Sequence, residues 1–148
     1  MALGATTYKT PNIIAKIGNN FTTKEGCGVY LVTANLVDIA TTTQAPPYGI
    51  IVTGTDSLTP GTYPSAIGDA SLELVDQLGC VVQVLISTTG GIVAGDFLLI
   101  DSNDGDGTFT SIGLQPPAAG EFVWGLALTD ADQGEQCLMR FQPYLQQV

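Results

Sequence analysis

The sequence predicts an all-β protein, built as a small antiparallel β-barrel or sandwich with an extended N-terminal arm. Three observations support this prediction. Short runs rich in β-branched and aromatic residues recur along the chain, turn residues separate them, and the last two runs alternate apolar and polar side chains. A length of 148 residues suits one domain. We therefore divide the chain into an arm, residues 1–24, and a β-domain, residues 25–148.

Four runs in the first part of the domain predict strands, at residues 28–37, 48–54, 80–87 and 96–101. The run at 80–87 is apolar on nearly both faces, which is typical of a central strand.

Residues 69–79 fit two patterns. Ala70, Leu74 and Leu78 recur at helical spacing, with Asp69 and Gly79 as possible caps. Leucine also alternates with polar residues there, as in a strand. We interpret the segment as a strand that ends in a hairpin turn at residues 76–79.

The final hairpin, residues 121–129 and 135–142, shows the clearest alternation. Period-2 spacing of this kind indicates half-buried strands. Trp124 and Phe122 share one face and offer a stacking platform for a sugar, but aromatic residues on such a strand are more typical of a core. The residues predicted to share a face are Phe122, Trp124, Leu126 and Leu128 in the first strand, and Cys137, Met139 and Phe141 in the second.

The net charge of −10, from 14 acidic and four basic residues, argues against two classes of partner. Nucleic-acid affinity rests on Lys and Arg that neutralise phosphates, and anionic membranes attract basic segments for the same reason. No run approaches the ~18 apolar residues that would span a bilayer. The N-terminus lacks the continuous apolar segment of a signal peptide. We therefore expect neither nucleic acid nor membrane as a partner.

The three cysteines, Cys27, Cys80 and Cys137, are odd in number and far apart. The chain has no CxxC pair and no histidine to complete a zinc site. We interpret the cysteines as small buried hydrophobic residues, which fits synthesis in a reducing cytosol.

The charge is divided unevenly along the chain. Residues 1–24 contain three lysines and no acid, and so carry +3, whereas Arg140 and all 14 acids give the remainder −13. A basic arm on an acidic body favours docking, either onto a neighbouring subunit or onto a partner. The candidate apolar anchors are Ile13, Ile14, Ile17 and Phe21.

The loop at residues 101–107 carries carboxylates at alternate positions, which is how proteins bind hard cations such as Ca²⁺. The candidate Ca²⁺ ligands are Asp101, Asn103, Asp104 and Asp106. Counted from Asp101, however, the EF-hand positions that require Asp or Asn, Gly and Glu hold Gly105, Asp106 and Ile112. We interpret the loop as a turn, and we expect no metal and no cofactor.

No pattern in the sequence indicates catalysis. Without histidine, the chain lacks the commonest general base and any Ser-His-Asp or Cys-His pair. Its 14 carboxylates are scattered through turns, and none stands out as a pair for glycoside hydrolysis. We therefore expect a protein that is not an enzyme.

Two motifs near the C-terminus carry a resemblance. Ala94-Gly95-Asp96 precedes an apolar strand, and the run Val123-Trp-Gly-Leu-Ala-Leu128 precedes Gly134-Glu135. Together with residues 48–54 and 79–84, these motifs resemble the capsid decoration (cement) proteins of tailed phages. The resemblance covers about two thirds of the chain and does not extend to the arm.

The resemblance implies a small β-barrel or sandwich, usually a trimer, on the outer capsid surface of a virion after synthesis in the host cytoplasm. Such a protein stabilises the capsid by bridging major capsid subunits, often through an N-terminal arm that adds a strand. The implied partners are the major capsid protein and further copies of the chain, as a homotrimer. The implied capsid-binding residues are Tyr8, Lys9, Ile13, Ile14, Lys16, Ile17 and Phe21.

Two other classes of function stay open. The first is another virion component, either a head-fibre base or a tail-tube subunit, and a tube subunit should sediment as rings or filaments. The second is a carbohydrate-binding β-domain that uses the acidic loops, which a glycan array would test.

Overall fold

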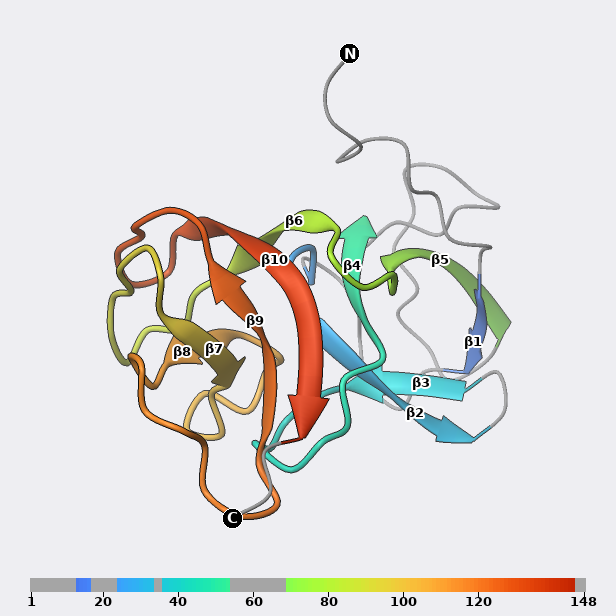
Figure 1. Ribbon diagram of the computed structural model, residues 1–148. Coiled ribbons are helices and arrows are strands. Elements are labelled where there is room, and N and C mark those ends of the chain that lie inside the picture. Colours follow the sequence, from blue (N-terminus) through green and yellow to red (C-terminus); the bar gives the residue numbers. More distant parts are fainter. Residues whose placement is uncertain (1–12, 17–23, 34–35, 54–68, 146–148) are drawn as a thin grey trace.

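The computed structural model describes residues 13–16, 24–33, 36–53 and 69–145. Within these residues the secondary structure consists of strands, arranged in two five-stranded antiparallel sheets (Figure 1). Each sheet takes its strands from one continuous part of the chain. The strands are β1 (Ile13–Lys16), β2 (Gly28–Thr33), β3 (Leu36–Ile39), β4 (Gly49–Thr53), β5 (Asp69–Val75), β6 (Val81–Leu85), β7 (Phe97–Ile100), β8 (Phe109–Ser111), β9 (Phe122–Ala127) and β10 (Gln136–Leu145).

The first sheet has the order β1-β5-β4-β2-β3 and curls until its edge strands, β1 and β3, lie near each other. Successive residues of β4 and of β5 therefore point into two different cores, one inside the curl and one between the two sheets. Ile51 and Leu74, which are opposite each other in the β4–β5 pair, are buried in the small core inside the curl. Ile50 and Val75 are buried in the main core, which also contains the second sheet. The small core consists of Val29, Val37, Ile39, Ile51 and Leu74.

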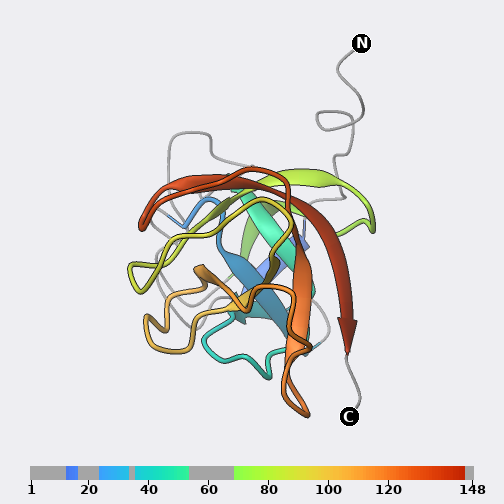
Figure 2. The ribbon, with the colours of Figure 1, turned by 60° about the vertical axis from the view of Figure 1, so that its left-hand side comes forward.

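The second sheet has the order β6-β10-β9-β7-β8 and is also strongly curved, as the arc of β10 in Figure 2 shows. A single parallel bridge between Ile86 and Phe109 joins the ends of its two edge strands. There the amide of Ser87 donates a hydrogen bond to the carbonyl of Phe109 over 2.9 Å. No continuous ladder closes the sheet within the described residues, so the architecture is a sandwich of two curled sheets and not a barrel.

Trp124 lies at the centre of the main core and is fully buried. Its ring makes edge-to-face contacts with Phe109 at 5.6 Å and with Phe141 at 6.4 Å between ring centroids. The first sheet approaches the indole closely, because a Cβ atom built on Gly28 of β2 would lie 2.8 Å from it. The prediction that Trp124 is a core residue, and not a sugar platform, is confirmed.

The prediction of an all-β sandwich is confirmed, and so is the final hairpin, since β9 and β10 pair antiparallel. Residues 69–79 form strand β5 followed by a turn, as we interpreted them, and not a helix. The three cysteines are free and buried. Strand β9 does not alternate as the sequence predicted. Val123, Trp124 and Gly125 are all buried, so both faces of β9 are covered at this point.

Two predicted strands are corrected. The run at 28–37 is not one strand, because β2 and β3 pair with each other as a hairpin. The run at 80–87 is not central, because β6 is an edge strand that alternates between buried and more exposed residues. Its residues are apolar for another reason. One face of β6 packs on the main core, and the edge of β6 that faces away from β10 lies near β4 of the first sheet.

Candidate functional site

The seven predicted capsid-binding residues fall into two groups. Ile13, Ile14 and Lys16 belong to β1, whose backbone pairs with β5 from Ile13 opposite Leu72 to Lys16 opposite Asp69. These three positions are therefore part of a sheet of the body. The other four, Tyr8, Lys9, Ile17 and Phe21, lie outside the described residues.

The acidic loop after β7 is held by hydrogen bonds from the protein itself. Asp101 is almost fully buried and accepts hydrogen bonds from the Thr89 hydroxyl and, over 2.8 Å, from the Asn103 amide. Burial alone would raise the pKa of Asp101, but the hydrogen bonds from Thr89, Ser87 and Asn103 together hold it below its ordinary value. Asp101 is therefore a buried carboxylate that stays ionised.

The neighbouring carboxylates also accept hydrogen bonds from threonines, and the Thr108 hydroxyl lies within reach of both Asp104 (3.5 Å) and Asp106. Asp104 accepts from the Thr88 amide at 2.8 Å and from the Thr88 hydroxyl at 3.0 Å, and Asp106 accepts from the Thr108 hydroxyl at 2.7 Å. Ca²⁺ needs six to eight converging oxygens. Across the described residues, no cluster of three or more His, Cys, Asp or Glu side chains is arranged to hold a metal ion. The loop thus fastens the turn after β6 to the β7–β8 connection, next to the bridge that joins the edges of the second sheet.

Replacing Asp101 with asparagine should destabilise the protein most above pH 4 and progressively less at lower pH. A carboxylate whose pKa is depressed by folding contributes stability above its unfolded pKa of about 3.9, and this contribution is lost as the pH falls through the lower folded value. Urea unfolding of both proteins between pH 2 and 7 measures the difference. A free-energy difference that does not depend on pH would contradict this role.

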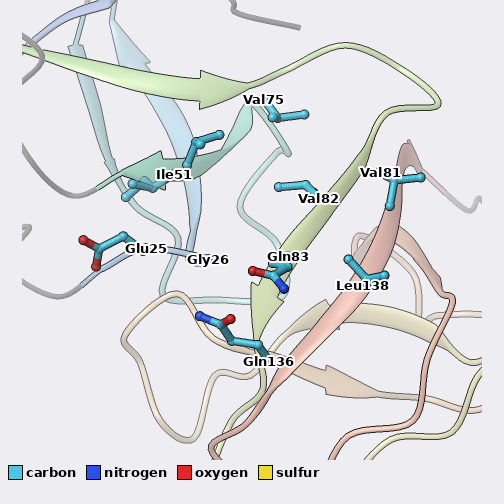
Figure 3. Close-up of a pocket in the computed structure, with 10 residues that line it drawn as sticks. Glu25, Gly26, Ile51, Val75, Val81, Val82, Gln83, Gln136 and Leu138 are labelled. Carbon is cyan, nitrogen blue, oxygen red and sulfur yellow. The ribbon is translucent and has the colours of Figure 1, made fainter. Parts of the chain in front are cut away.

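A groove lies between the two sheets and is lined by residues of both (Figure 3). Its volume is about 300 Å³. Val52 and Leu138 at its rim are 47% and 37% exposed, which is high for large apolar side chains. The lining comes from the segment before β2, from β4, β5, β6 and β10: Glu25, Gly26, Ile51, Val52, Val75, Val81, Val82, Gln83, Gln136 and Leu138.

Gly26 joins the two sheets at one end of this groove. Its amide donates to the Ile51 carbonyl at 2.8 Å, and its carbonyl accepts from the Leu85 amide at 3.0 Å. A Cβ atom at Gly26 would lie 2.8 Å from that same Leu85 nitrogen, and the backbone φ of +83° is one that glycine adopts freely. Glycine at this position therefore allows the first sheet to reach the edge of β6.

Along the rest of the groove, the outer edge of β6 is not paired with any strand of the described residues. The Leu85 amide points away from β10, to Gly26, whereas the Ile86 amide points to Glu135 at the β10 side. Because backbone groups in a strand alternate in direction, those of Gln83 and Val81 point the same way as Leu85. In the described part of the chain, no strand lies beside Gln83 and Val81 on that side.

The polar groups in the groove are one carboxylate and two side-chain amides. Glu25 supplies the negative charge, and Gln83 and Gln136 are diagonal neighbours on β6 and β10 (Figure 3). Lys24, next to Glu25, is directed to the carbonyl of Asp106 at 3.5 Å. An open strand edge, an apolar floor and a single carboxylate are features that bind an extended peptide. The residues that line the groove include no nucleophile paired with a base.

Reasoning from the sequence did not find this groove. Its residues come from five segments spread between residues 25 and 138, so no local motif marks it. The available signal was the apolar run at 80–87, which was interpreted as a central strand.

Comparisons with known proteins are informative at the level of the fold. No family model matches the chain, and no curated protein matches it. Among solved structures, the chain is similar to the N base of head fiber gp8.5 of bacteriophage phi29, with a TM-score of 0.60 and 17% sequence identity. The match covers 91% of this chain and 95% of that one. The two proteins share a fold. No helix in the described segments is long and apolar enough to cross a bilayer.

Proposed function

We propose that this chain is a structural, non-enzymatic protein of a phage virion, located on the outer surface of the head, where it binds and bridges major capsid subunits. The observation that carries the proposal is the fold shared with a phage head-fiber base over nearly the full length of both chains. The acidic surface charge and the absence of histidine from the sequence are consistent with a structural role.

The motifs that resemble decoration proteins have structural roles in the fold. Gly95 adopts a φ of +98°, and Asp96 beside it accepts hydrogen bonds from the Val93 amide and, over 2.6 Å, from the Ser111 hydroxyl. Gly134 has a φ of +73°, and its amide donates to the Ile86 carbonyl. The motifs therefore mark turns that this architecture requires. They support the proposal only because they belong to the shared fold.

A head-fibre base is the second candidate, favoured because the similar structure is the N base of a phage head fiber. The two candidates differ in what extends from the domain on the particle. A decoration protein forms isolated protrusions at regular positions on the capsid, whereas a base carries a fibre. Subnanometre electron cryomicroscopy of particles that contain this chain would show either isolated protrusions or a fibre, and so would distinguish the two candidates.

Deleting residues 1–12 should abolish binding to the capsid. This deletion removes Tyr8 and Lys9 of the arm but retains β1, which pairs with the body. Many weak contacts act together on a lattice, so losing one contact in each copy lowers occupancy steeply. Co-sedimentation with particles assembled from the major capsid protein alone measures occupancy for the full and shortened chains.

The control is a Lys9→Gln variant of the full chain, which retains the arm and removes one charge. It should bind with reduced occupancy and with less dependence on salt. Full occupancy by the shortened chain would contradict the role of the arm. If the full chain does not bind to the particles at all, the proposed function itself is wrong.

A further inference from the structure

We propose that the groove at the free edge of β6 binds the N-terminal segment of a second copy of this chain, and that residues 6–10 of that copy add to β6 as a strand. Copies would then be linked by a backbone contact between the arm of one and the body of the next. This contact includes Tyr8 and Lys9, which are also proposed to bind the capsid, so the arm of a given copy makes one of the two contacts at a time. Self-association is therefore measured in the absence of a capsid.

The groove offers what an added strand needs. The backbone amides and carbonyls of Val81 and Gln83 face it without a neighbouring strand among the described residues. Unpaired groups of this kind on an edge strand are a template for another chain. The exposed side chains of Val52 and Leu138 supply apolar surface on either side of the edge. The unpaired edge ends where Gly26 occupies the Leu85 amide, so an added strand would be short.

Residues 6–10 have the chemistry to fill the groove. They read Thr-Thr-Tyr-Lys-Thr, a run of β-branched and aromatic residues with high strand propensity. Pro11 follows directly and, having no amide hydrogen, ends a strand there. Strand β6 is five residues long, which matches the length of this run.

Charge favours a second copy as the occupant. Each body carries a charge of −13, so two bodies repel each other. A body attracts the arm of another copy, because residues 1–24 carry +3 and are the one basic region in the sequence. Within the groove, Glu25 can pair with Lys9 of the arm, whereas Lys24 is directed to Asp106. Residues 11 and 12 alone separate the segment from β1, so the two linked bodies would be in contact.

A proline scan of the edge tests the backbone contact. Gln83→Pro removes the amide hydrogen that faces the groove, and Gln83→Ala is the matched control that retains it. Sedimentation velocity in the absence of any capsid should show self-association by wild type and Gln83→Ala. The dissociation constant should rise at least tenfold for Gln83→Pro and for the chain without residues 1–12. Unchanged thermal unfolding of the bodies shows that they are folded.

Charge reversal of the contact gives a second measurement. Glu25→Lys should weaken self-association, and Lys9→Glu combined with Glu25→Lys should restore part of it. Asp132→Lys, an exposed acid outside the groove, is the control and should leave self-association unchanged or make it stronger. Equal weakening by Glu25→Lys and Asp132→Lys would overturn the assignment.

Disulfide trapping identifies the occupant directly. Gln83→Cys is combined in turn with cysteine at residues 7, 8 and 9, and the protein is oxidised. The native cysteines give little background because they are buried, and burial raises the pKa of Cys27 to about 12. At least one pair should give covalently linked multimers on a non-reducing gel. The proposal would be overturned if the disulfide formed within one chain or if no pair formed a disulfide. It would also be overturned if the wild-type protein were monomeric at all concentrations, whatever the capsid assay shows.

Discussion

Replacing Gly125 with alanine should lower the free energy of unfolding by about 3 kcal/mol or more. A Cβ atom at this position would lie 2.2 Å from the carbonyl oxygen of Arg140 and 2.8 Å from the Met139 side chain. The oxygen belongs to the backbone of β10, paired with β9, so it cannot move without breaking the sheet. Overpacking in a core costs about 1–3 kcal/mol, and a backbone clash in an internal strand should reach or exceed the upper value. Urea unfolding and the soluble yield measure the effect.

Gly90→Ala is the matched control. A Cβ atom at Gly90 would contact nothing within 4 Å, and the backbone there is not in the left-handed region. Its free energy of unfolding should change by less than about 1 kcal/mol. Similar losses in the two variants would show that the packing of β9 against β10 is not what requires glycine.

The second large effect is expected for Trp124→Ala. The indole is fully buried and contacts Phe109 and Phe141 edge to face, so its removal leaves a cavity at the centre of the main core. Loss of a buried Trp costs about 3–5 kcal/mol. For a chain of this size, that loss lowers the melting temperature by roughly 10 °C. Differential scanning calorimetry measures the shift.

Trp124→Phe separates volume from polarity. Within the described residues the indole nitrogen of Trp124 is buried and has no hydrogen-bond partner. Phenylalanine removes this unsatisfied donor while it retains most of the apolar contact. The variant should therefore lose clearly less stability than Trp124→Ala. Equal losses would indicate that the indole donor is satisfied in solution.

The fold class was predictable because local patterns determine it. Turn residues and β-branched runs located most strands, and the alternation of Cys137, Met139 and Phe141 identified the buried face of β10. The place of a strand within its sheet was not predictable. Strand β6 is as apolar as a central strand because it lies beside the first sheet, and that contact depends on residues distant in the sequence.

The candidate site was less accessible from the sequence than the fold. The arm was identified by its charge, and the acidic loop was interpreted as a turn from its mismatch with the EF-hand pattern. The groove depends on Gly26 meeting Leu85 and on β4 and β5 lying opposite β6. Such a site exists only after two sheets have packed, so its residues share no spacing that a reader of the sequence could recognise.

The division of the sheets along the chain has a consequence for biosynthesis. All strands of the first sheet precede residue 76, and all strands of the second follow residue 80. During translation the first sheet can therefore curl around its small core while the second half is still in the ribosome. Its outer face, with Ile50 and Val75, stays uncovered until β6 to β10 arrive. Nascent chains in which residues up to about 80 have left the ribosome, but β6 to β10 have not, should thus be the species most prone to aggregation and most in need of a chaperone.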